Sequence, residues 1–314
     1  MSVVPQQQVQ APPAPTAPAR IEREFTVKSR SQTQQAVRRF LHNRLAVGAL
    51  VVYVILLLVA FIGPYFYSYE FSYQDGNSLS VGPGTNGHIF GTDSIGRDLA
   101  LLMMRGIQRS TFISIVFVAV AGTLGVLIGS LAGYFGRSID NVLMRFVDII
   151  LTIPILIAIV VVANAFPGAR SPLGIALFIA FLGWMDLSRI VRSQFLSLRE
   201  REYVEAAHAL GASDRRIIFK HLIPNSLGQI IVWATLGAAA AVITEAALSY
   251  LGYGVQGADT SLGRLVADGA AAADSRPWLF YFPGLAILVI VMSINLIGDG
   301  IRDAFDPSAT RVRA

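Results

Sequence analysis

The sequence predicts an all-α integral membrane protein in which six helices cross the bilayer. Its composition is far more apolar than that of a soluble domain, since 54% of the 314 residues are hydrophobic and only 14% are charged. A soluble protein carries about 25% charged residues. In addition, six apolar stretches approach or exceed the roughly 20 residues that a membrane-spanning helix needs. They cover about 45–62, 110–134, 142–165, 173–190, 227–251 and 278–297.

The first 35 residues differ from the rest of the chain. Residues 1–20 consist largely of Pro, Ala and Gln without apolar periodicity. Such a segment buries too little surface to offset its chain entropy, so we expect 1–35 to be a disordered cytoplasmic tail. No small-residue cleavage pattern ends the first apolar run, so we do not expect a signal peptide. The membrane domain is then expected over 36–307.

The distribution of Lys and Arg predicts the orientation, because cytoplasmic loops are enriched in these residues. With the N-terminus in the cytoplasm, only six of the 25 basic residues fall outside: Arg97, Arg105, Arg109, Arg170, Arg264 and Arg276. Both termini and the segment 199–225 are therefore predicted to be cytoplasmic. The net charge of +5 is explained by this distribution, without a nucleic-acid partner.

The second apolar stretch has two further features. Before it, Leu99, Leu102 and Ile107 recur at helical spacing, which indicates either an amphipathic helix on the outer surface or an extension of the span. Within it, small residues recur every four positions and let another helix backbone approach closely, either within the chain or from a neighbouring subunit. These residues are Gly125, Gly129 and Gly133.

Polar residues inside the predicted spans need a polar setting, because a mid-bilayer carboxylate costs about 2.5–3.5 kcal/mol on insertion scales. Asp186 precedes Arg189 by three residues, and we favour an ion pair along the helix. Glu245 either lines a pathway or hydrogen-bonds the backbone of the 249–254 turn, and we favour the second. Asn164 and Asn295 are further candidates for a pathway or a structural role.

The sequence contains no recognisable motif for catalysis, nucleotide binding or metal binding. The chain has no cysteine, no Gly-Lys pair of a phosphate-binding loop, and no histidine spacing typical of a metal site. The glycines of 252–257 match a dinucleotide fingerprint, but they follow a predicted membrane helix rather than a strand. We therefore expect no catalytic residues, no metal and no cofactor bound by this chain.

The segment 199–225 interrupts the apolar chain with a short basic stretch. Good helix formers over 202–210 predict a helix, and Gly211 is expected to end it in the left-handed conformation that glycine tolerates. Alanines leave this helix slim, and Glu205 gives it a carboxylate. A slim, rigid helix of this kind suits insertion into a groove on another protein.

A second short helix is expected after this turn. Ser213 or Asp214 can cap its start, and Pro224 is expected to end it, because the residue before a proline is disfavoured in α conformation. Basic side chains surround the two helices and are placed for lipid phosphates or acidic partner residues: Arg199, Arg201, Arg215, Arg216 and Lys220.

The spacing of Glu205-Ala206-Ala207, Gly211 and Pro224 resembles the EAA signature of permease subunits in ATP-binding-cassette importers. His221 departs from the signature, which usually has an apolar residue there. Further stretches are similar to the C-type permease of dipeptide and oligopeptide importers, and together they cover about 36–307. They are 39–44, 91–98, 133–136, 145–148, 244–249 and 295–299.

This resemblance implies a type I importer permease fold, with 199–225 as the coupling loop that docks on the ATPase. The docking residues would be Arg201, Glu205, Ala206, Ala207, Leu210, Gly211, Arg215, Arg216 and Pro224. The implied partners are a homologous B-type permease, two ATPase subunits that hold ATP and magnesium, an extracytoplasmic binding protein, membrane lipid and a peptide substrate. Nickel-chelate, glutathione or another small ligand is the alternative cargo. A self-sufficient channel or ion-driven carrier is a different class, and it would need an ionisable relay through the spans.

Overall fold

The computed structural model describes residues 32–257 and 259–305. Their regular structure is helical, and only two isolated β-bridges occur among them. The predicted all-α membrane class is confirmed. Most of the tail predicted to be disordered lies outside the described residues. At 32–35, however, the chain is already helical, because helix α1 begins at Gln32.

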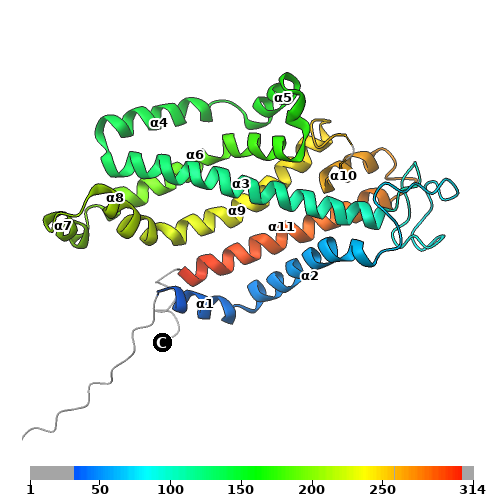
Figure 1. Ribbon diagram of the computed structural model, residues 1–314, viewed down its shortest axis with the longest axis horizontal. Coiled ribbons are helices and arrows are strands. Elements are labelled where there is room, and N and C mark those ends of the chain that lie inside the picture. Colours follow the sequence, from blue (N-terminus) through cyan, green and yellow to red (C-terminus); the bar gives the residue numbers. More distant parts are fainter. Residues whose placement is uncertain (1–31, 258, 306–314) are drawn as a thin grey trace, which may run out of the picture.

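Long helices run side by side as an elongated bundle, with α7 and α8 at one end and α10 at the other (Figure 1). The loop 67–98 lies beside α10. The elements are α1 Gln32–His42, α2 Arg44–Phe66, α3 Leu99–Phe135, α4 Arg137–Leu151, α5 Ile155–Ala165, the 3-10 turn η1 Pro167–Arg170, α6 Pro172–Leu198, α7 Glu202–Ala209, α8 Asp214–Ile217, the π turn η2 Ile218–Leu222, α9 Ile223–Tyr250, α10 Leu262–Ala270 and α11 Trp278–Phe305.

Five stretches in the described part of the chain are long and apolar enough to cross a membrane as continuous helices: α2, α3, α6, α11, and α9 with the turns before it. The sixth candidate is the pair α4 and α5, which meet at a bend of 83°. The predicted third span, 142–165, is therefore not one straight helix. Pro154 explains the break, because proline lacks an N–H and disfavours α conformation in the residue before it.

The apolar residues before the second predicted span belong to that span. Helix α3 is continuous over 37 residues, so there is no separate surface helix at 99–107. Asp98 starts it, because its Oδ1 accepts a hydrogen bond from the Leu101 N–H at 3.0 Å. Leu102 and Ile107 then pack in a cluster with Leu262 of α10, which anchors the extension.

Pro224 does not end the second cytoplasmic helix, contrary to prediction. The helical path from Asp214 to Tyr250 is continuous, and Pro224 lies in the first turn of α9. In the π turn before it, the Ile223 N–H bonds to the Ile218 carbonyl five residues back. This wider turn shifts the backbone hydrogen bonds from the residue four positions back to the residue five positions back, just before the proline. Pro224 itself has no N–H to donate, which is tolerated in the first turn of a helix.

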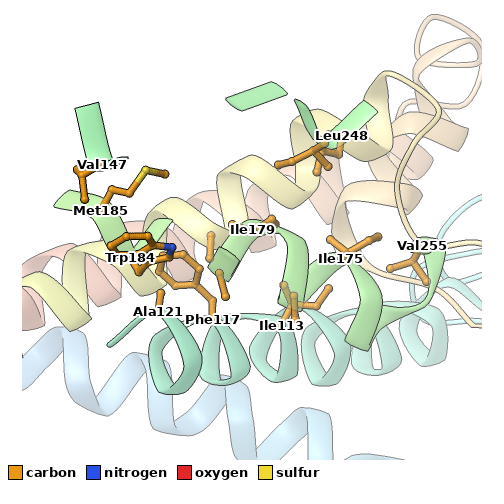
Figure 2. Packing of buried hydrophobic residues seen from close by; sticks show 14 residues of the cluster. Ile113, Phe117, Ala121, Val147, Ile175, Ile179, Trp184, Met185, Leu248 and Val255 are labelled. Carbon is orange, nitrogen blue, oxygen red and sulfur yellow. The ribbon is translucent and has the colours of Figure 1, made fainter. Parts of the chain in front are cut away.

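Helix α3 packs most extensively against α6. A Cβ added at Gly129 would lie 2.5 Å from the Ser188 carbonyl oxygen, and one at Gly133 would lie 2.6 Å from the Phe195 Cβ. At Gly125 the same test gives 2.7 Å to the Leu187 Cβ. The three glycines therefore serve packing within this chain. Beyond them, Phe117 and Ala121 of α3 face Trp184 of α6 in the adjoining core (Figure 2).

We expect Gly129→Ala to destabilise the protein, because the added methyl group has no room against the α6 backbone. Overpacking of this kind costs about 1–3 kcal/mol, which thermal unfolding in detergent will detect as a lower melting temperature. Gly48→Ala is the matched control, since a Cβ there meets nothing within 4 Å. Equal melting of the two variants would contradict this account of the α3–α6 contact.

Candidate functional site

Helix α7 ends in a complete Schellman turn. Gly211 has φ +78°, its N–H bonds to the His208 carbonyl, and the Ala212 N–H bonds to the Ala207 carbonyl at 3.0 Å. These two bonds satisfy carbonyls at the helix end that otherwise lack partners. Gly211 thus makes the turn expected from the sequence, and α8 leaves it in a new direction.

Most of the predicted docking residues lie on the exposed side of this loop. Leu210 is 88% exposed at the tip, an unusual place for a large apolar side chain. Ala207 differs from the others, because it is half-buried and packs against the apolar cluster beneath α7. The exposed members are Arg201, Glu205, Ala206, Leu210, Gly211, Arg215, Arg216 and Pro224.

Tyr134, near the end of α3, joins the two parts of the loop. Its hydroxyl donates a hydrogen bond to Asp214 Oδ1 of α8 at 2.6 Å and lies 3.3 Å from His208 Nε2 of α7. The rings of Tyr134 and His208 also stack, with centroids 6.4 Å apart. The contact went unnoticed in the sequence because it joins residues more than 70 positions apart.

The cluster beneath α7 connects the loop to the membrane helices. Val204 of α7 and Ile217 of α8 are buried in it together with Val191 and Phe195 of α6. A continuous apolar contact therefore leads from the loop into the bundle. Close-packed interiors transmit displacement because they have little room to deform, so a force on α7 reaches α3 and α6.

The predicted pair Asp186–Arg189 is wrong. Arg189 instead reaches Asp148 of α4, with Nη2 2.6 Å from Oδ1. Next to it, Arg192 of α6 bonds to both carboxylate oxygens of Asp140 on α4. Two Arg–Asp contacts therefore attach α4 to α6, and they take Arg189 away from Asp186.

Asp186 is exposed and lines a groove between α3, α6 and α9. The groove has a volume of about 380 Å³. Among its lining residues, Phe117 of α3 and Trp233 of α9 stack with ring centroids 5.8 Å apart. The groove lies beside the apolar core shown in Figure 2, in which Phe117 is labelled.

The other polar candidates lie outside this groove. Glu245 is fully buried, and its Oε1 accepts hydrogen bonds from Ser249 and from Ser261, which caps α10. Within the 249–254 turn it thus bonds to the Ser249 side chain rather than to the backbone. Asn164 bonds to Arg170 at 3.1 Å, and Asn295 is half-buried on α11. In the described part of the chain, no group of three His, Asp or Glu side chains could hold a metal.

A buried polar cluster organises the loop 67–98, and no local pattern in the sequence indicated it. His88 is fully buried, with Nδ1 2.8 Å from Asp98 Oδ2 and Nε2 3.6 Å from Asp75 Oδ2. The Tyr67 hydroxyl donates to Asp98, and burial together with this carboxylate raises the pKa of Tyr67 to about 12. Hydrogen bonds from Ser78 and the Asn77 N–H lower the pKa of Asp75. The cluster fixes the loop to the start of α3.

The comparisons with known proteins identify the family. Residues 125–311 match "Binding-protein-dependent transport system inner membrane component", and residues 31–83 match "N-terminal TM domain of oligopeptide transport permease C". The chain belongs to this permease family. It is 40% identical to "Oligopeptide transport system permease protein OppC" of Mycobacterium tuberculosis (strain ATCC 25618 / H37Rv), over 90% of this chain and 97% of that protein.

Two further relatives and one solved structure agree. Identity is 38% to the protein of the same name from Bacillus subtilis (strain 168), over 89% of this chain and 91% of that one. It is 39% to "Dipeptide transport system permease protein DppC" of Alkalihalophilus pseudofirmus, over 88% and 90%. The inward-facing MetNI methionine ABC transporter matches with TM-score 0.51 and 20% identity, over 65% of this chain and 96% of that chain, which supports the fold.

The permease family determines the general role of the chain. It is a multi-pass inner membrane protein and a transport subunit of an ATP-binding-cassette importer. Such a permease works with ATPase and substrate-binding partners. The exposed loop with α7 therefore belongs to a subunit that works together with an ATPase.

We expect Tyr134→Phe to loosen the segment 202–217 without unfolding the bundle, because only the hydroxyl contacts to Asp214 and His208 are lost. Hydrogen exchange should rise about tenfold over 202–217, as expected for one lost hydrogen bond to a charged group. Tyr203→Phe is the matched control, since Tyr203 is an exposed tyrosine on α7. Unchanged exchange in Tyr134→Phe would show that the apolar cluster alone holds the loop.

Proposed function

We propose that this chain is the C-type permease subunit of an importer for di- and oligopeptides. It pairs with a homologous B-type permease, docks on two ATPase subunits and receives peptide from an extracytoplasmic binding protein. The observation that carries the proposal is the identity of 37–40% to permeases named for oligopeptide or dipeptide transport, over about nine-tenths of the chain.

In this proposal α7 is the coupling helix. Glu205 and Ala206 lie on its exposed face and Leu210 directly follows the helix, while Ala207 packs inward and Gly211 sets the turn. Closure of the ATPase dimer moves α7, and the Tyr134 contact and the cluster beneath α7 pass the movement to α3 and α6. The two permeases then rotate as rigid bodies between inward-open and outward-open states. ATP and magnesium stay on the partner subunits.

The proposed orientation places both termini and 199–225 in the cytoplasm. Its support is the excess of Lys and Arg on that side. The loop 67–98 and α10 lie at the opposite end of the bundle from α7, so they face the binding protein (Figure 1).

Peptide uptake by the assembled complex tests the cargo. Proteoliposomes with all subunits should accumulate a labelled tripeptide only when ATP is inside with the ATPases, and unlabelled di- to hexapeptides should compete. Uptake of nickel-chelate or glutathione without competition by peptides would contradict the peptide cargo. Transport by this chain without any ATPase would contradict the importer mechanism.

We expect Glu205→Lys to abolish ATP-dependent uptake while leaving membrane insertion intact, because it reverses the charge on the exposed face of α7. Transport should fall at least tenfold, and co-purification of the ATPase should fall with it. Asp303→Lys makes a matched charge reversal at an exposed position on α11, outside 199–225, and should transport normally. Wild-type uptake by Glu205→Lys would exclude this face as the docking site.

A further inference from the structure

Asp186 is the charged side chain in the groove between α3, α6 and α9. The described residues around it are mostly apolar, such as Ile179, Val232 and Leu236. No hydrogen bond or ion pair reaches Asp186 from the described part of the chain, and Arg189 is engaged with Asp148. The carboxylate therefore stands exposed near the middle of a 27-residue membrane helix.

The helical periodicity of α6 places this carboxylate on the side of the helix that faces the groove. On α6, Ile179, Gly183, Asp186 and Ile190 recur at intervals of four, three and four residues, so they share one face. Small residues of α9 line the hollow together with this face: Gly237, Ala240 and Ala241. Asp186 is thus presented to whatever occupies the groove.

A carboxylate in the membrane requires a cation or water, because lipid tails cannot solvate its charge. The groove adds a second feature suited to a cation. The rings of Phe117 and Trp233 form part of its wall, and aromatic faces attract ammonium groups. An anionic oxygen in a groove that also contains aromatic rings suits an ammonium ion, and the lining offers an anionic group no basic side chain.

We propose that Asp186 binds an ammonium group of the peptide as it passes through this groove. The inference rests on the proposed function, since it takes the cargo to be a peptide. The ammonium can belong to the peptide N-terminus or to a lysine side chain, which present the same chemistry. Asp186 is then a specificity-determining residue of the permease, separate from any selection by the binding protein.

The test compares uptake of trialanine and N-acetyl-trialanine by the complete complex in proteoliposomes. Asp186→Asn should lower kcat/KM for trialanine by about tenfold or more, the size expected for a lost charge-assisted hydrogen bond, and leave the acetylated peptide unchanged. Asp186→Glu should restore most of the loss. Because all variants use the same binding protein, a change in the ratio of the two peptides comes from the permease.

A third peptide, N-acetyl-Ala-Lys-Ala, distinguishes the two sources of ammonium. Loss of its uptake in Asp186→Asn shows that the site takes any ammonium, and its retention restricts the site to the N-terminus. Asp299→Asn, an exposed aspartate on α11 outside the groove lining, should transport like the wild type.

Two outcomes overturn the inference while the peptide cargo stands. An unchanged ratio in Asp186→Asn means that Asp186 does not touch the cargo ammonium. An equal loss for both peptides means that Asp186 pairs with a basic group of the neighbouring permease instead. If the wild-type complex takes up neither peptide, the proposed cargo is wrong and this inference falls with it.

Discussion

The close contact of α3 with α6 is the constraint on which the other features depend. Apolar helices gain little from contact with each other in lipid, so van der Waals packing between small residues must hold them. Gly125, Gly129 and Gly133 provide it by resting on the α6 backbone. Their spacing fixes the rotation of α6 about its own axis. As a result one side of α6 carries Arg192 toward α4, another carries Phe195 toward α7, and a third carries Asp186 into the groove.

Helix α3 connects the two ends of the molecule. It is 37 residues long, which corresponds to about 55 Å of α-helix. Its first turn is held by Asp98, which also bonds to His88 and Tyr67 of the loop 67–98. Its last turn carries Tyr134, which bonds to Asp214 of α8. One rigid element thus contacts both the loop 67–98 at one end of the bundle and the segment that carries α7 at the other.

Local features were predictable from the sequence, whereas contacts between distant segments were not. Gly211 was recognisable because the end of a helix often requires one residue in the left-handed conformation, which glycine adopts without a steric penalty. The long apolar runs indicated the membrane spans. The break at Pro154 was missed because the apolar run continues through it. Asp186–Arg189 looked like a pair from spacing alone, but Asp148 on another helix offers Arg189 a partner at 2.6 Å. His88 lies in a loop without periodicity, so nothing in the local pattern marked its burial.

The π turn before Pro224 has a consequence for how the chain tolerates change. Because α8, η2 and α9 form one continuous helical path, the exposed face of α8 and the groove-lining face of α9 share a common phase. Each residue of an α-helix turns the chain by about 100°. Removing one residue from Ile218–Leu222 would leave both surfaces intact in composition but rotate one against the other. The length of this turn is thus as much a part of the transport machinery as the side chains at its two ends.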